Sequence, residues 1–156
     1  MSWSSRLTEL GLVLPPVATP AGAYLPAVRS GSLVFTAGQL PMINGALAAT
    51  GKLGAAIDPA RGPELARICA LNALAAVDGL VGLDAVVQVV KVVGFVASAP
   101  GFTAQPAVVN GASQLLGEVF GTAGGHARSA VGVAELPLDA PVEVELIVEV
   151  SAGPAG

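Results

Sequence analysis

Hydrophobic and polar residues alternate most clearly near the C-terminus, in residues 142–150. One face of this segment holds only valine and leucine, and the other holds three glutamates and an isoleucine. A period of two predicts a β-strand with one buried face. A second strand is predicted at residues 129–135, where Ala130, Gly132 and Ala134 share a face. These small residues would admit close approach of another backbone.

Helical periodicity appears in two longer segments, residues 63–80 and 102–120. Pro63 suits the first turn of the earlier helix, and Glu64 complements the positive end of its dipole. Between the helices, residues 86–97 carry valine on both faces. This pattern predicts a central strand covered on both sides, with Gly94 as a candidate bulge.

The N-terminal part predicts shorter elements. A serine can cap a helix over residues 2–11, and Gly11 suits its end. Residues 24–29 and 33–36 predict a hairpin with its turn at residues 30–32. Residues 42–54 read as a loop with a short strand at 46–48.

The predicted order after the first helix is β-β-α-β-α-β-β, an α+β arrangement in one domain over residues 1–156. Residues 1–16 form an N-terminal helical extension and residues 151–156 a tail. Two helices cover only one face of a sheet, so the other face needs a partner. The chain is 53% hydrophobic and 12% charged, against about 25% charged in typical domains. Both observations favour an oligomer.

Charge and cysteine content exclude several classes of function. Seven basic and eleven acidic residues give a net charge of -4, which argues against nucleic acid as a partner because phosphate binding needs clustered Lys and Arg. Cys69 is the only cysteine, so no internal disulfide or multi-cysteine metal site is possible. No stretch predicts a membrane span or a signal peptide. We therefore expect a cytoplasmic protein.

Arg128 and Glu143 are the strongest candidates for chemistry. A guanidinium grips a carboxylate with two hydrogen bonds, and a glutamate near an apolar pocket can activate a water. The alternative is a salt bridge from Arg128 to Glu143 or Asp139, at the surface or at a subunit interface, with the glutamates of the last strand on a solvated face. The residues by themselves leave both interpretations open.

Three further polar residues have weaker claims. His126 is the only histidine and titrates near neutrality, but the glycine-rich residues 121–125 predict a flexible loop rather than a catalytic position. Tyr24 and Asn110 stand within apolar stretches. Each can bind a ligand or satisfy a backbone group.

Three segments resemble the signatures of the Rid/YjgF family of reactive-intermediate deaminases, also known as L-PSP endoribonucleases. The C-terminal signature is matched by Ala-Arg-Ser-Ala-Val at 127–131, Leu-Pro at 136–137 and Val-Glu-Val-Glu at 142–145. Phe-Thr-Ala-Gly-Gln-Leu-Pro at 35–41 resembles the N-terminal signature, and Val109-Asn110 falls where the family has Val-Asn. The resemblance extends over residues 24–150.

The resemblance implies a chorismate-mutase-like fold, with a sheet backed by two helices, in a homotrimer whose sheets form a central barrel. It implies hydrolysis of 2-imino and enamine acids to 2-keto acids and ammonia in clefts between subunits, without a cofactor or metal. By position, Arg128 would clamp the substrate carboxylate and Glu143 would place the water. The backbone of Gly38 and Ala130 would hold the substrate, and Tyr24 and Asn110 would line the cleft.

The chain also departs from the family. Many members have cysteine at the position of Ala130 and serine at that of Ala37, and the first helix and the 121–126 loop look like additions. We therefore expect a divergent branch. The leading hypothesis is a 2-iminobutanoate/2-iminopropanoate-type deaminase. Its rival is a non-catalytic protein that binds a small carboxylate such as a 2-keto acid. An endoribonuclease ranks third.

Overall fold

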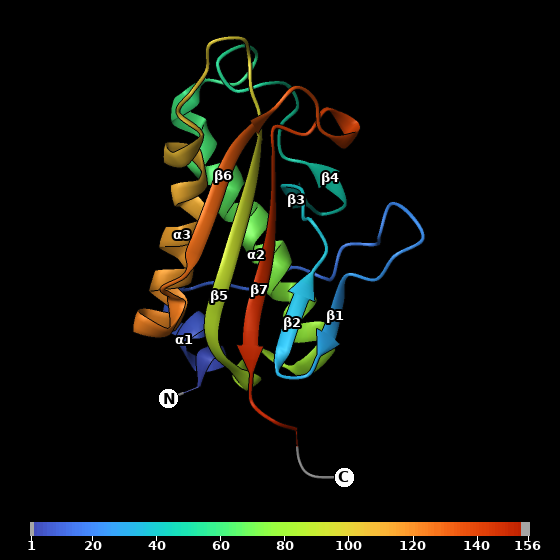
Figure 1. Ribbon diagram of the computed structural model, residues 1–156, viewed down its shortest axis with the longest axis vertical. Coiled ribbons are helices and arrows are strands. Elements are labelled where there is room, and N and C mark those ends of the chain that lie inside the picture. Colours follow the sequence, from blue (N-terminus) through green and yellow to red (C-terminus); the bar gives the residue numbers. More distant parts are fainter. Residues whose placement is uncertain (1, 154–156) are drawn as a thin grey trace.

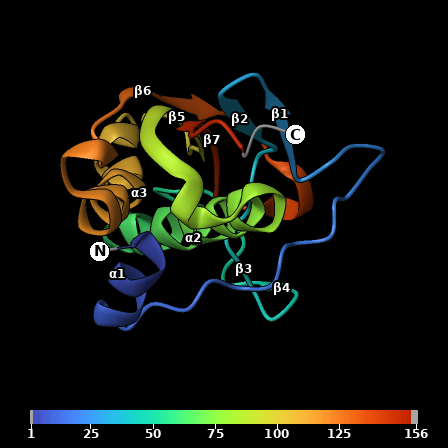
Figure 2. The same ribbon diagram turned by 90° about the horizontal axis from the view of Figure 1, so that it is seen from below.

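The computed structural model describes residues 2–153 and contains a five-stranded sheet with its helices on one face (Figures 1 and 2). The strands lie in the order β1-β2-β7-β5-β6. The predicted β-β-α-β-α-β-β order of an α+β fold is confirmed. In chain order the elements are α1 (Trp3–Glu9), β1 (Ala27–Ser30), β2 (Leu33–Thr36), β3 (Met42–Ile43), β4 (Ala46–Leu47), α2 (Gly62–Val81), β5 (Val86–Ala97), α3 (Gln105–Phe120), β6 (Ala127–Val133) and β7 (Val142–Val150).

Strand β7 lies at the centre of the sheet and pairs antiparallel with β2 and β5. Strand β6 is parallel to β5 because α3 connects them across one face. The alternation predicted for β7 is confirmed: its valines and leucine are buried, and the glutamates and Ile147 are half-buried on the other face. The buried row faces the helices and packs into the core that they cover.

The small residues of β6 face helix α3, not the bare side of the sheet. Ala130 lies beside Gly94 of β5, and a Cβ built on Gly94 would lie 2.7 Å from Val109 Cγ1 on α3. The close approach predicted for this face is therefore made by the chain's own helix. The bulge predicted at Gly94 is wrong, since the register shifts fall near Val86 and Val89. Glycine is needed at position 94 to make room for Val109.

Helices α2 and α3 pack at very short range through Gly111. A Cβ built there would lie 2.8 Å from the Cα of Pro63 on α2. The buried leucines and valines of both helices, together with Phe120, fill the space between the helices and the sheet. Only a residue without a side chain permits this crossing of the two helices.

Helix α1 is fixed to the end of α3 and the start of β5. Ser2 caps it by accepting the Ser5 amide, as predicted. The Trp3 ring meets Phe120 edge to face at 5.2 Å, and its Nε1 donates to the Val86 carbonyl at 2.8 Å. The chain then runs past α2 towards β1 as an extended connection, which we call the strap (residues 11–26; Figure 2).

Two local predictions in the N-terminal half are wrong. The first strand begins at Ala27 and excludes Tyr24, because Pro26 cannot donate a hydrogen bond to the ladder. Strand β3 was not predicted; it pairs with β4, and Asn44 and Gly45 between them have φ of 50° and 80°. These angles suit a tight hairpin, for which Asn-Gly is a strong sequence signal.

The face of the sheet opposite the helices is bare. It exposes Val131 (45%) and Phe35 (41%) beside the half-buried Glu143 row. Strand β5 was predicted to be covered on both faces, but the helices cover only one, and Val93 and Phe95 on the other are half-buried. Among residues 2–153, no helix has both the length and the apolar character needed to cross a bilayer.

Candidate active site

Arg128 lies on the edge strand β6, and three oxygens of helix α3 hold its guanidinium. Its Nη1 donates to Asn110 Oδ1 at 2.8 Å and to Ser113 Oγ at 3.2 Å, and Nη2 donates to the Pro106 carbonyl at 3.3 Å. All three acceptors are neutral. In the described part of the chain, no carboxylate lies within salt-bridge distance of Arg128, so the alternative of an intrachain salt bridge is wrong. Within residues 2–153 the guanidinium therefore has no ion-pair partner.

His126 is fixed beside this arginine. Its Nε2 lies 2.9 Å from Ser113 Oγ, and its Nδ1 lies 2.6 Å from the Gly124 carbonyl. The flexible loop predicted here is instead a 3-10 turn, Gly121–Gly124, whose last residue is buried against the carbonyl of Leu116. His126 is half-buried as a result. Nothing in the sequence pattern singled out Ser113, which links the two side chains.

Glu143 lies on β7 and points to the bare face of the sheet, in register with Phe95 of β5. Its carboxylate packs against the backbone of Gly38, where a built Cβ would lie 2.7 Å from Glu143 Cδ. Gly38 is held there because Gln39 exchanges two backbone hydrogen bonds with Val144, of 2.8 and 3.0 Å. A side chain at position 38 would therefore displace the carboxylate.

The electrostatics of Glu143 suit a proton acceptor. Burial raises the pKa of its carboxyl, and the nearby charge of Glu145 raises it further. Within residues 2–153, no side chain donates a hydrogen bond to it. A carboxylate with a raised pKa and free lone pairs can take a proton from water.

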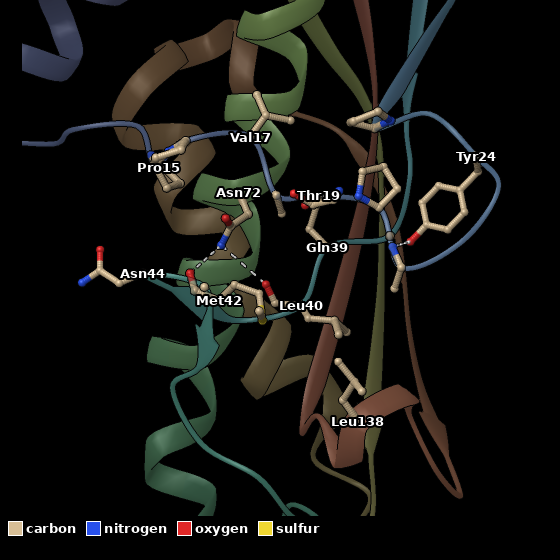
Figure 3. A pocket seen from close by; sticks show the side chains of 17 residues that line it. Pro15, Val17, Thr19, Tyr24, Gln39, Leu40, Met42, Asn44, Asn72 and Leu138 are labelled. Atoms are coloured by element: carbon tan, nitrogen blue, oxygen red, sulfur yellow. Dashed lines mark hydrogen bonds between the residues drawn. The ribbon is translucent and has the colours of Figure 1, made fainter.

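Tyr24 and Gly38 line a cavity of about 460 Å³ under the strap (Figure 3). The Tyr24 hydroxyl accepts the Ala21 amide at 3.2 Å, and half of the residue is exposed. The walls are mostly apolar, with Gln39 and Asn72 as buried polar residues. They come from the strap, from residues 38–45, from Asn72 on α2 and from Leu138.

Asn72 ties this cavity to helix α2. Its Nδ2 donates to the carbonyls of Met42 and Ile68, both at 3.0 Å (Figure 3 shows the bond to Met42). In the sequence, Asn72 is one position of the helical repeat predicted over residues 63–80. The helical periodicity puts this polar residue on the buried face, and a buried polar side chain needs hydrogen-bond partners. That combination is the sequence signal that could have identified Asn72.

The predicted site residues thus fall into two groups. The first, which we call the arginine half-site, contains Arg128 and Asn110, with Ala130 half-buried on the same side of β6. The second, the glutamate half-site, contains Glu143 with Gly38, and Tyr24 lies on the cavity beside it.

One chain cannot bring the two half-sites together. Arg128 on β6 is in register with Val92 of β5, and Val92 is in register with Leu146 of β7. Arg128 therefore lies two strands away from β7, at the level of a residue three positions along from Glu143. These offsets are each about 10 Å. The two side chains also point to opposite faces of the sheet, because Val92 and Leu146 are buried under the helices and Glu143 is not.

Comparison with known proteins places this geometry in a family. The model described as "YjgF/chorismate mutase-like, putative endoribonuclease" matches residues 4–150. Protein TCP17 of Trypanosoma cruzi is 45% identical over 150 residues, which are 95% of this chain and 94% of the relative.

Solved structures agree with this match. A crystal structure described as a "putative endoribonuclease" from Shewanella oneidensis is 34% identical, covers 96% of this chain and 100% of its own, and has a TM-score of 0.93. E. coli TdcF, solved with bound serine, is 27% identical, covers 86% of this chain and 94% of its own, and has a TM-score of 0.64. The chain belongs to the YjgF/chorismate-mutase-like family and has that family's α+β fold.

Proposed function

We propose that this protein hydrolyses 2-imino acids to 2-keto acids and ammonia, at a site built from the arginine half-site of one copy and the glutamate half-site of another. The observation that carries the proposal is the environment of Arg128. Three neutral oxygens orient its guanidinium, and none of them compensates its charge. A guanidinium prepared in this way suits a substrate carboxylate.

The chemistry needs few groups because the imine carbon is already electrophilic. Arg128 binds the carboxylate and orients the substrate. Glu143 accepts a proton from a water molecule as the water oxygen bonds to C2, and the proton then passes to the substrate nitrogen. This gives a carbinolamine, whose C2 hydroxyl then passes its proton to the nitrogen. The C2–N bond breaks, ammonia leaves, and C2 becomes the ketone of the 2-keto acid. One water is consumed and no electrons are transferred, so no redox cofactor is required.

The raised pKa of Glu143 fits this role. A base whose pKa lies closer to neutrality takes the water proton more readily and still releases it to the nitrogen. Burial provides this shift, with help from Glu145. The apolar cavity beside Gly38 and Tyr24 leaves space next to Glu143 for the substrate side chain.

Assembly of copies is part of the proposal. The two half-sites lie on opposite faces of the sheet, so a three- or four-carbon acid can touch both only if they come from different chains. The bare face of the sheet exposes Val131 and Phe35, which favours burial against another copy. The homotrimer implied by the family resemblance would satisfy both conditions.

Four observations bear on the two alternative functions. TdcF was solved with bound serine, a small molecule with a carboxylate, which fits either a deaminase or a protein that only binds small acids. An endoribonuclease is favoured by the family description. However, the net charge of -4 gives little attraction for RNA, and both ring nitrogens of His126 are engaged within the chain.

A coupled assay tests the proposal: a threonine dehydratase generates 2-iminobutanoate, and loss of the imine is followed with and without this protein. We expect acceleration over hydrolysis in buffer, lost in both Arg128→Ala and Glu143→Ala. Binding of 2-oxobutanoate, measured by calorimetry, should be lost in Arg128→Ala and kept in Glu143→Ala. If imine loss is no faster than in buffer but 2-oxobutanoate binds, the protein is a binding module and the proposed enzyme is refuted.

A further inference from the structure

We propose that Ser113 and His126 are positioning residues, which fix the guanidinium of Arg128 so that one of its edges stays free for a carboxylate. The inference rests on the proposed function, since it deepens the role given there to Arg128. It concerns two side chains that do not touch the substrate and act through the arginine.

The hydrogen bonds of His126 determine which group donates and which accepts in the series of contacts that joins Gly124, His126, Ser113 and Arg128. The Gly124 carbonyl can only accept, so the ring nitrogen Nδ1, 2.6 Å away, carries the hydrogen. In the neutral ring Nε2 is then an acceptor, and Ser113 donates its hydroxyl hydrogen to it over 2.9 Å. The lone pairs of Ser113 Oγ are left for Arg128 Nη1 at 3.2 Å.

The three hydrogen bonds in this series therefore run in one direction: Arg128 donates to Ser113, Ser113 donates to His126, and His126 donates to the Gly124 carbonyl. Bonds arranged head to tail in this way polarise and strengthen one another. His126 prevents the Ser113 hydroxyl from rotating towards the guanidinium and presenting a hydrogen to it. A buried carbonyl in the 3-10 turn thus determines the orientation of an arginine on β6.

The bonds also select which edge of the guanidinium is free. The contacts with Asn110 and Ser113 use both Nη1 hydrogens, and the Pro106 carbonyl uses one of the two on Nη2. Among residues 2–153, Nε–H and one Nη2–H have no acceptor. Nε and Nη2 lie along one edge of the planar group, and this is the edge that we propose receives the two oxygens of a carboxylate. Fixing the arginine in advance lowers the entropy lost when the substrate binds.

The test compares Ser113→Ala, Ser113→Thr, His126→Leu and His126→Gln in the full chain. Two quantities are measured: the dissociation constant of 2-oxobutanoate, and the ¹⁵N–¹H NMR signal of Arg128 Nε. Ser98→Ala is the matched control, because Ser98 is also a part-buried serine that donates to a carbonyl (Val96, 2.8 Å) and accepts from a side chain at α3 (Gln105, 3.1 Å).

We expect Ser113→Ala and His126→Leu to weaken 2-oxobutanoate binding by about 10-fold, the size expected for a hydrogen bond to a charged group. The KM for the imine should rise by a similar factor while kcat changes less than threefold. The Arg128 Nε signal should shift or broaden. Ser113→Thr keeps the hydroxyl and His126→Gln keeps an acceptor for it, so both should restore binding to within about threefold of wild type. Ser98→Ala should behave as wild type.

Unchanged binding and an unchanged Arg128 signal in Ser113→Ala and His126→Leu would overturn the inference. Equal loss in Ser98→Ala would do the same, since it would indicate general loosening of α3. Failure of the proposed function is separate. If wild type neither binds 2-oxobutanoate nor accelerates imine loss, the deaminase proposal fails, and the Arg128 signal in the variants still decides whether Ser113 and His126 fix the guanidinium.

Discussion

Replacing Gly38 with alanine should slow turnover strongly while sparing carboxylate binding. The backbone of Gly38 has no positive φ, so alanine adds no conformational strain and the effect is purely steric. A Cβ built there would lie 2.7 Å from Cδ and 3.0 Å from Cγ of Glu143. Carbon atoms in contact are normally about 3.5–4.0 Å apart. The carboxylate must therefore retreat by about 1 Å.

A displacement of about 1 Å in a reacting group can cost about 100-fold in rate, equivalent to about 2.7 kcal/mol in the activation free energy. We expect kcat in the coupled dehydratase assay to fall by that factor. The dissociation constant of 2-oxobutanoate should change less than threefold, because Arg128 and its acceptors are untouched.

Gly117→Ala is the matched control for this prediction. Gly117 is also without a positive φ, and a Cβ built on it meets nothing within 4 Å. Its kcat should equal that of wild type. The reasoning about Glu143 is refuted if Gly38→Ala, correctly folded and assembled, keeps kcat within twofold of wild type.

Two further predictions concern stability. Glu143→Gln should raise Tm, and the gain should grow from about pH 4, the ordinary glutamate pKa, towards neutrality. The raised pKa of Glu143 means that the folded state holds the proton more tightly than the unfolded chain, so the wild type loses stability as the carboxyl ionises. A gain in Tm that is equal at about pH 4 and pH 7 in calorimetric scans would contradict this. Gly111→Ala should cost about 3 kcal/mol of unfolding free energy in urea titrations, because its Cβ would lie 2.8 Å from the Cα of Pro63 and force the helices apart; a loss below about 1 kcal/mol would show that α2 and α3 can separate easily.

The elements of the fold could be predicted well because their signals are local. The strands Val86–Ala97 and Val142–Val150 have the predicted bounds. Helix α2, Gly62–Val81, lies within one residue of its prediction. The Asn44-Gly45 hairpin also had a local signal and was still missed, because its strands are only two residues long.

Predictions about the faces of the sheet were less successful. The small residues of β6 were expected to admit close approach of another backbone, and what they face is the chain's own helix α3. Periodicity tells which residues share a face, but not which face of the sheet the helices cover. That choice depends on the handedness of the β5-α3-β6 crossover, which no single residue encodes.

The site shows the same division. The residue types and motifs in the sequence were sufficient to select Arg128 and Glu143 and to pair Arg128 with Asn110 as neighbours of a cleft. Only the tertiary structure separated Arg128 from Glu143 by two strands and the thickness of the sheet, because position within a motif carries no information on register. It also fixed His126 through Ser113, 13 residues away in the chain. A contact between a helix and the end of a strand exists only after the two have packed.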